Sequence, residues 1–547
     1  MAMAKQSDVY ADSLAQLNQE GPSKDNIRLL KVVDSNEDGL VCELQVFSLS
    51  DAPNYATISY SWVTTNAYTS IVLQTTCARR TIPVSEDAKN ALMRLSTANE
   101  FGWLWMDMIC INQSDNDEKS DQVSMMFNIY QSSQCVFIWL GEEAPDDGRV
   151  YTGEIPAGLT HAKVKQFLGL GNRVWWRRLW VWQEIAASHK RRVCIGSHVA
   201  TFDEFFNVLR HSSGAVSLQP DFAAWSSKDR GAYSEAHDIV DAFRTDLSRD
   251  SPRDHTIHTL LYMTTGTATS SPHDRIYALL GISSVEDRNA IKIDYSITVS
   301  SLYQHVTEYM VESTKSLDII MKDDRPRGKG VPPYNAERPC HDLALPTWVP
   351  DYSQSLLISE GDTFRRRRKP MGGVSRNTVP DFSVHDSFLR LRAIQFDVIR
   401  WTHKIRDDRD SLGADFIEFN NRCSSEPGAV QHTERPEAPL RSLLPLPSGR
   451  YQQTNDAAKR HNSYGMSMLA FVTEHGFQGF TAHACEPGDV VFVPYGASDP
   501  WILRHSHLAA GDGKPLWNLI ADCWLGGVMK GGVVDLVEAG QVESELR

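Results

Sequence analysis

The sequence predicts an α/β fold, with a mainly parallel sheet flanked by helices, then a helical middle region and a smaller β-rich C-terminal domain. Two observations predict it. Short apolar runs alternate with amphipathic helical patterns through the first third of the chain, which is typical of strand–helix–strand units. After residue 466, short strands are separated by Gly and Pro turns instead.

The composition narrows the class of protein. The chain has 547 residues, and 69 Asp and Glu against 55 Lys and Arg give a net charge of −14. This charge argues against general nucleic-acid binding, because phosphate contacts need a basic surface. Nine cysteines are scattered singly, which argues against a disulfide framework or a zinc site. Without a signal peptide or a membrane-length apolar run, a cytoplasmic protein is expected.

The first strands and helices can be placed from periodicity. Residues 55–60 (YATISY) predict a strand rich in β-branched and aromatic residues, and 70–75 with 80–84 predict a hairpin. Ser85 then caps a predicted helix. Residues 135–141 (CVFIWLG) predict a further buried strand of the same sheet.

An acid interrupts the most apolar run of the chain. Residues 103–111 (WLWMDMICI) predict an inner strand, and Asp107 lies within it. Ligands of parallel sheets bind beyond the carboxyl ends of the strands, so Asp107 can mark the start of a pocket. The alternative is that Asp107 braces a neighbouring loop by accepting backbone N–H bonds. The acids that follow, in 114–121, predict a solvated helix start rather than a metal site.

A second acid stands in a Trp-rich segment. Residues 172–190 predict one helix, on which Trp180 and Glu184 share a face. No helical neighbour of Glu184 offers a cation, so this carboxylate is a candidate for a raised pKa or a functional contact. The alternative is that Glu184 pairs with an arginine from elsewhere, such as Arg177 or Arg178 of a partner subunit, or accepts backbone bonds.

Several segments together resemble one family. "YATISYSW", "LWMDMICINQSDNDEKSDQVSMMFNIYQSSQCVFIWLG" and "RLWVWQE" look like the successive blocks of the fungal heterokaryon-incompatibility (HET) domain. "DRIYALLG", "PTWVPDYS" and "PGDVVFVPYG" look like the longer fungal proteins that carry this domain. The family usually has Gly after "SYxW", where this chain has Val63, which would alter the exit loop of the first strand.

The resemblance implies a function. Such proteins serve fungal non-self recognition, and they trigger growth arrest or programmed cell death when unlike hyphae fuse. The HET domain is in turn distantly similar to TIR domains, so a TIR-like sheet is expected. In enzymatic TIR domains, a Glu at the position of Glu184 serves cleavage of NAD+. The resemblance therefore implies NAD+ as substrate, no prosthetic group, a homo-oligomer on activation, and another incompatibility protein as partner.

These observations define a candidate site and two functions. Cleavage of the nicotinamide–ribose bond passes through an oxocarbenium-like state, so Glu184 is the predicted catalytic residue of an NAD+ glycohydrolase. The alternative is a non-enzymatic scaffold whose HET domain recruits partners. An open aromatic pocket at Glu184 would favour the enzyme, and a Glu184 sealed in an ion pair would favour the scaffold. No metal ligand is predicted. The predicted substrate-binding residues are Tyr60, Ser61, Trp62, Asp107, Cys110, Asn112, Gln113 and Trp180.

Composition and resemblance also divide the chain into segments. Residues 405–465 are rich in Arg, Asp, Ser and Pro, and they are expected to form a flexible insertion that proteases cleave first. The basic run Arg365–Lys369 would allow nuclear entry or bind an anion, and the alternative is an ordinary solvated loop. The expected segments are a flexible tail at 1–25, the HET domain at 26–212, a helical middle region at 213–325, a connecting region with short strands at 326–404, a flexible insertion at 405–465 and a β-rich domain at 466–547.

Overall fold

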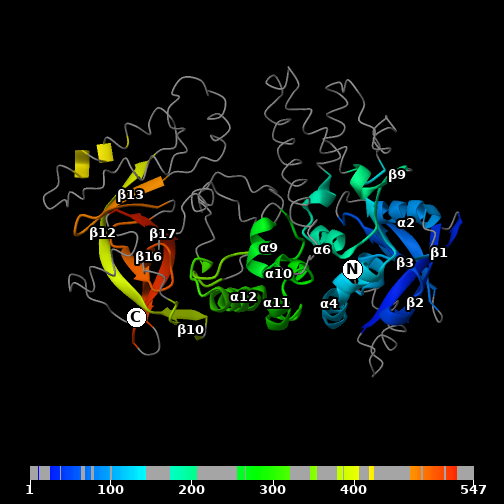
Figure 1. Ribbon diagram of the computed structural model, residues 1–547, viewed down its shortest axis with the longest axis horizontal. Coiled ribbons are helices and arrows are strands. Elements are labelled where there is room, and N and C mark those ends of the chain that lie inside the picture. Colours follow the sequence, from blue (N-terminus) through cyan, green and yellow to red (C-terminus); the bar gives the residue numbers. More distant parts are fainter. Residues whose placement is uncertain are drawn as a thin grey trace, which may run out of the picture. The chain divides into compact units, whose positions relative to one another are not determined.

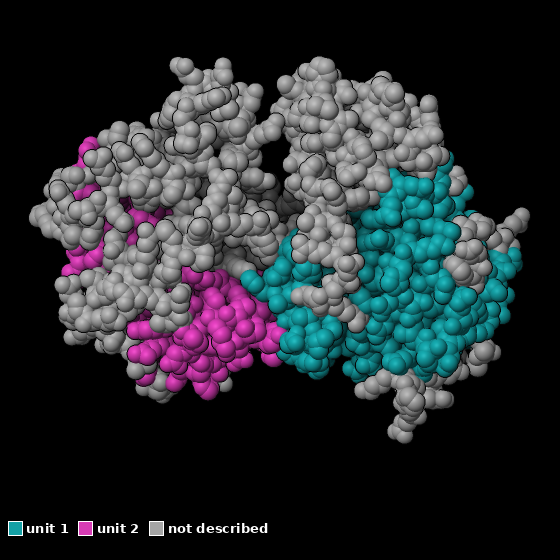
Figure 2. Space-filling view, viewed as in Figure 1, with its two compact units in different colours: residues 1–298 teal, residues 299–547 magenta. Residues whose placement is uncertain are grey.

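The computed structural model divides the chain into two compact units, residues 1–298 and 299–547 (Figure 1, Figure 2). The structure describes residues 10, 25–36, 39–62, 68–75, 79–98, 102–142, 173–196, 198–205, 255–264, 267–320, 345–353, 379–385, 387–405, 415, 418–419, 421–423, 468–481, 485–509 and 513–526.

Unit 1 is built on a nine-stranded sheet in the order β5-β4-β2-β1-β6-β3-β7-β8-β9. Its pairs β2–β4, β3–β6, β3–β7 and β7–β8 are parallel, and the other four are antiparallel. The α/β class is therefore confirmed, but the sheet is mixed rather than mainly parallel. The strands are β1 (Asn26–Asn36), β2 (Gly39–Ser48), β3 (Tyr55–Ser59), β4 (Tyr68–Gln74), β5 (Arg79–Ser85), β6 (Trp103–Trp105), β7 (Cys135–Trp139), β8 (Arg191–Ile195) and β9 (His198–Thr201).

The parallel centre of this sheet confirms part of the sequence prediction. Strand β3 is buried along its whole length and lies between β6 and β7, both parallel to it. The predicted hairpin is the antiparallel pair β4–β5. Strands β1 and β2 pair antiparallel with each other and lie inside the sheet, between β4 and β6. An alternating apolar pattern does not reveal which strand it pairs with, so this position was not predicted.

The strand predicted over 103–111 is wrong beyond Trp105. The chain turns there into a short helix, α3 (Asp107–Cys110), and the carbonyl of Met106 accepts N–H bonds from Ile109 (3.0 Å) and Cys110 (2.8 Å). Asp107 therefore begins a helix and does not lie inside a strand. Apolar character alone does not separate a buried strand from a buried helical turn, which explains the error.

Helices pack on the sheet as periodicity predicts, with one exception. Helix α2 (Glu86–Ala98) is capped by Ser85, whose hydroxyl accepts a bond from the N–H of Ala88 (3.1 Å). Helix α4 (Asn116–Ser132) buries Val123, Met126, Phe127 and Tyr130, which lie at helical spacing. The exception is the Trp-rich helix, which is broken into a 3-10 turn, η5 (Val174–Arg177), and α6 (Trp180–Ala187).

The residues of unit 1 that the structure describes after 255 include the helices α9 (Ile257–Met263), α10 (Asp274–Leu280) and α11 (Val285–Ala290). Helix α6 packs against both α4 and α10, and Figure 1 shows the three helices close to one another. Helix α10 follows the predicted HET domain in sequence, and it packs against α6, the helix that carries Glu184.

Unit 2 begins with helix α12 (Val299–Thr314) and continues as an antiparallel sheet in the order β17-β16-β15-β12-β13-β14-β18. Strand β12 bridges its two halves by pairing with both β15 and β13. The predicted β-rich C-terminal region is confirmed, and β12 adds to it a strand from the predicted connecting region. The strands are β10 (Phe382–His385) and β11 (Phe388–Leu391), which pair with each other, then β12 (Ala393–Ile405), β13 (Met468–Thr473), β14 (Gln478–Thr481), β15 (Val490–Pro494), β16 (Trp501–Ala509), β17 (Pro515–Asp522) and β18 (Trp524–Leu525).

Some predictions fall outside the described residues. These are the basic run at 365–369, nearly all of the N-terminal tail and most of the insertion at 405–465. Among the helices that the structure describes, none has the length and apolar character that a bilayer crossing requires.

Candidate functional site

The Glu184 carboxylate lies in the interior of unit 1. Glu184 is in the middle of α6 and is only 1% exposed. The hydroxyl of Ser59 donates a hydrogen bond to its Oε2, and the guanidinium Nη1 of Arg178 lies 3.9 Å from its Oε1. Both carboxylate oxygens therefore face polar groups of the same chain.

Ser59 is the last residue of β3, where the strand meets the Trp-rich segment. Its Oγ also accepts a hydrogen bond from the indole Nε1 of Trp175 (2.7 Å). A hydroxyl that accepts from an indole can direct its own proton to a second partner, here Glu184. Trp175, Ser59 and Glu184 thus form a continuous chain of hydrogen bonds inside the fold.

Arg178 owes its position to the break in the Trp-rich segment. Its backbone is extended, and the chain on either side of it pairs with Ala268: the N–H of Leu179 donates to the Ala268 carbonyl (3.1 Å), and the Ala268 N–H donates to the Arg177 carbonyl (2.6 Å). The Arg178 side chain donates to the carbonyl of Tyr60 and is 16% exposed. An arginine therefore lies beside Glu184, as one predicted alternative proposed, but it comes from the same chain and not from a partner subunit.

Asp107 lies at the start of α3, behind the end of β6. The indole Nε1 of Trp62 donates to both of its carboxylate oxygens (3.1 and 3.0 Å), and the N–H of Met108 donates to Oδ1 (2.7 Å). The side-chain amide of Gln113 donates to the Asp107 carbonyl (3.0 Å). Asp107 therefore braces the turn that follows β6, as one of the two alternatives expected.

Burial controls the protonation of these acids. Burial raises the pKa of Glu184 to about 7, although Arg178 and the Ser59 hydrogen bond lower it and the Asp107 charge raises it further. Burial also raises the pKa of Asp107, again opposed first by Arg178. One guanidinium thus serves two buried carboxyl groups. We call Ser59, Asp107, Arg178 and Glu184 the charge cluster.

Two predicted site residues line the cluster without joining it. Tyr60 and Ser61 follow β3 and are buried, and neither hydroxyl has a hydrogen-bond partner in the described structure. Burial holds the pKa of Tyr60 well above its usual range, with the Asp107 charge as the next cause. Unpaired buried hydroxyls carry a desolvation cost, so the interior around the cluster is not fully satisfied.

The remaining predicted residues point elsewhere. Cys110 is buried, and burial raises the pKa of its thiol to about 12, so it is no nucleophile at neutral pH. Asn112 caps its own turn by accepting from the N–H (3.3 Å) and hydroxyl (2.7 Å) of Ser114. The indole of Trp180 is a polar neighbour of Asp274 of α10 and lowers the pKa of that carboxyl group. The structure thus gathers Trp62, Asp107 and Glu184 but not these three.

Sequence reasoning missed Ser59 and Trp175, and it named Arg178 only as a residue of a partner subunit and missed its contact with Glu184 within one chain. Ser59 could have been found as the last polar residue of a wholly buried strand, since a buried hydroxyl needs a partner. Arg178 could not, because a continuous helix would turn it away from Glu184.

A second buried ion pair lies under the turn after α3. Arg28 of β1 donates to both carboxylate oxygens of Glu118 (2.5 and 3.0 Å), and the N–H of Asn112 donates to the same carboxylate (2.7 Å). The ring of Tyr10 lies 4.7 Å from the Arg28 guanidinium carbon. The predicted solvated helix start is therefore wrong for Glu118, which is buried, although Asp117 beside it is exposed.

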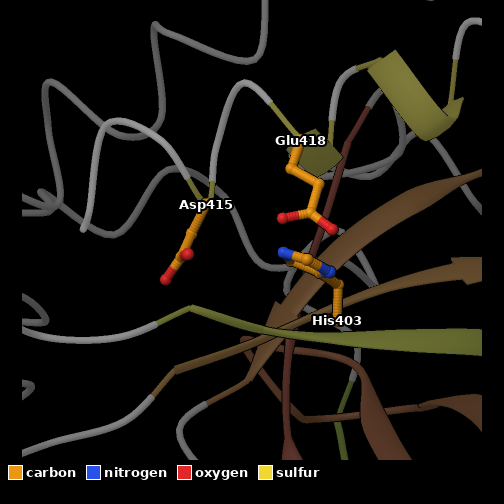
Figure 3. Close-up of side chains that lie close together, drawn as sticks. All are labelled: His403, Asp415 and Glu418. Carbon is orange, nitrogen blue, oxygen red and sulfur yellow. The ribbon is translucent and has the colours of Figure 1, made fainter.

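One group of metal-ligand residue types occurs among the described residues, in unit 2. The ligand atoms of His403, Asp415 and Glu418 lie within 4.8 Å of one another. Ligand atoms around a tetrahedral zinc are closer, about 3.3 Å apart at zinc–ligand bonds of about 2 Å. Figure 3 shows the Glu418 carboxylate over the imidazole and the Asp415 carboxylate directed away from it. Since Glu418 is also exposed, this arrangement is not a formed metal centre.

Comparison with known proteins defines the class of domain. Residues 55–184 match the profile of the family described as heterokaryon incompatibility protein (HET). The match begins with β3 and ends at Glu184, so the Ser59–Glu184 hydrogen bond joins its two ends. The chain carries a HET domain, and the charge cluster lies wholly inside it.

The similarity extends beyond that domain. The chain is 23% identical to "Heterokaryon incompatibility protein 6, OR allele" of Neurospora crassa, over 94% of this chain and 95% of the relative. Both units are therefore part of the shared sequence. No solved structure gives a significant match, so the likeness to TIR domains stays a prediction.

Proposed function

We propose that this chain is a non-self recognition protein, and that it triggers growth arrest or programmed cell death through its HET domain. The observation that carries the proposal is the similarity to an incompatibility protein along nearly the whole length of both chains. A match confined to residues 55–184 would support only the assignment of the HET domain, and not a role for the entire chain. The similarity of both units supports a shared role for the entire chain.

The geometry of the charge cluster favours signalling by recruitment of partners. With Glu184 1% exposed and held by Ser59 and Arg178, its carboxylate is out of reach of any substrate in this conformation. A sealed glutamate is the arrangement expected of a scaffold. On this proposal the HET domain assembles with further copies of the chain, or with another incompatibility protein, and the cluster stabilises its interior.

Cleavage of NAD+ is the second candidate, and one specific observation favours it. Burial raises the pKa of Glu184 to about 7, and such shifted acids are enriched at catalytic sites. The ionised form would stabilise the oxocarbenium-like state at the ribose carbon as nicotinamide departs. This candidate requires the cluster to open, so that Glu184, Trp62 and Asp107 meet the substrate.

One variant separates the two candidates. Glu184→Gln keeps the shape of the side chain but removes the negative charge, which would slow NAD+ cleavage about a hundredfold. Purified full-length wild type and variant are incubated with NAD+, and both are expressed in fungal hyphae whose growth is scored. Glu86→Gln, at an exposed glutamate of α2, is the matched control.

Each outcome decides between the candidates. NAD+ loss and growth arrest that both vanish in Glu184→Gln, while Glu86→Gln keeps them, support the enzyme. Growth arrest by all three proteins without NAD+ loss supports the scaffold. If the wild-type chain arrests no hyphae under any pairing of strains, the proposed function itself is refuted.

A further inference from the structure

Residues 267–298 lie beyond the HET match but inside the same compact unit. We call them the clamp segment. They contain α10 and α11, and they contact α6 at its start, along its length and through a side chain held by α4.

The first contact fixes the start of α6. The backbone of Ala268 bonds to the chain on both sides of Arg178, with the two bonds of 3.1 and 2.6 Å described above. These bonds hold Arg178 in its extended conformation. Since Arg178 reaches the Glu184 carboxylate from this position, the clamp segment also sets the geometry of the charge cluster.

The second contact is a polar junction at the first residue of α6. The hydroxyl of Tyr295 donates to the buried Asp274 carboxylate (2.6 Å), and the indole of Trp180 is a polar neighbour of the same carboxylate that lowers its pKa. Tyr295 is itself held by α4, because its N–H donates to the Ser120 hydroxyl (3.0 Å) and Lys119 Nζ lies 3.9 Å from its ring centre. The junction therefore ties α6 to α4 through the clamp segment.

The third contact lies along the helix. With its amide oriented to match its neighbours, Gln183 of α6 donates to the Ala278 carbonyl (3.2 Å) and accepts from the Phe127 N–H (3.1 Å). At Gly281, just after α10, an added Cβ would lie 2.3 Å from the end of the Gln183 side chain. The two helices thus approach as closely as a glycine permits.

We infer that the clamp segment keeps α6 closed over the HET domain, and that release of the Trp180–Asp274–Tyr295 junction frees α6 and uncovers the Glu184 carboxylate. The inference rests on the proposed function in one respect: the open form is taken as the signalling form. A short helix of eight residues is marginal by itself, so loss of its tertiary contacts should loosen it. The clamp is thereby a restraint on the site, supplied by the sequence that follows the domain.

Two tyrosines of the clamp segment provide a matched test. Tyr295→Phe removes the bond to Asp274 and leaves the ring in place. Tyr277→Phe removes an equivalent hydroxyl, whose hydrogen bonds are to the backbone of Asp294: it donates to the carbonyl (2.8 Å) and accepts from the N–H (3.2 Å). The Tyr277 ring packs 5.1 Å from that of Tyr295. Both variants are made in the full chain, and hydrogen exchange of the amides of α6 is followed by mass spectrometry.

We expect hydrogen exchange in α6 to be about tenfold faster in Tyr295→Phe than in wild type, because the loss of one hydrogen bond to a carboxylate has an effect of this size. In Tyr277→Phe we expect the exchange rate of α6 to be unchanged. Equal exchange in all three proteins, or equal acceleration in both variants, overturns the clamp. Asp274→Ala removes the whole junction and should accelerate exchange further if the clamp exists.

Growth of hyphae expressing the same variants tests the signalling step separately. Growth arrest by Tyr295→Phe without an unlike partner, and none by Tyr277→Phe, supports a restraint on signalling. If α6 loosens but growth is normal, the clamp stands as a structural restraint and the proposed role of the open form fails. If α6 does not loosen, the clamp fails whatever the growth result.

Discussion

The guanidinium of Arg178 lies 3.9 Å from the carboxylate of Glu184. The backbone of Arg178 is extended, whereas that of Glu184 is helical. The same guanidinium lowers the pKa of both Glu184 and Asp107. Two acids buried with one cation make a cluster whose stability depends on that cation and on pH.

Replacing Arg178 by Met should destabilise unit 1 by about 3 kcal/mol at pH 7, because two buried carboxyl groups lose their only cationic neighbour in the cluster. The measurement is the free energy of urea unfolding. The double variant Arg178→Met with Glu184→Gln should recover part of the loss, since one acid no longer needs compensation. Additive losses in the double variant would show that the pair is not coupled.

The cluster predicts a pH dependence with a definite sign. The pKa of Glu184 is about 7 in the folded protein against an ordinary value of 4.5, so the folded state retains a proton that the unfolded chain loses. Its contribution is complete below pH 4.5 and disappears as the pH rises through about 7. The free energy of unfolding of wild type, relative to Glu184→Gln, should therefore fall by up to about 3 kcal/mol between these limits. A difference that rises with pH, or stays flat, contradicts the assignment.

Glu118 should matter far more than its neighbour Asp117, although both lie in the first turn of α4. Glu118→Gln removes the carboxylate that the buried Arg28 contacts, and this should cost about 3–5 kcal/mol. Asp117→Asn, at an exposed position, should change stability by less than about 0.5 kcal/mol. Thermal unfolding of the two variants side by side checks the contrast, and similar losses would mean that the pair with Arg28 contributes little.

Gly281→Ala should lower stability by about 2 kcal/mol, because the new methyl group meets the buried end of Gln183. Gln183→Ala in the same chain should relieve the clash, so that the double variant is more stable than the sum of the single losses predicts. Urea unfolding of the three variants supplies the cycle. If Gly281→Ala alone is neutral, α6 and α10 are less closely packed than the structure indicates.

The sequence predicted the elements better than their limits. Periodicity correctly located β3, β7, the β4–β5 hairpin, α2 and α4, because each buries one face or both. The strand predicted over 103–111 ends at Trp105, and the helix predicted over 172–190 is interrupted at Arg178. Both errors arise where the chain turns within an apolar run, and hydrophobicity does not distinguish a buried turn from the element before it.

The amino-acid sequence by itself determined the α/β class and the HET resemblance, and it singled out Asp107 and Glu184 as candidate site residues, because burial patterns and unusual acids are local properties. Tertiary structure alone decided the partners of those acids. Ser59 lies far from Glu184 along the chain, and Arg178 reaches it only because the backbone breaks beside Ala268, a residue beyond the matched domain. A buried charge is stabilised by whatever groups the fold brings to it, and local sequence does not encode that distance.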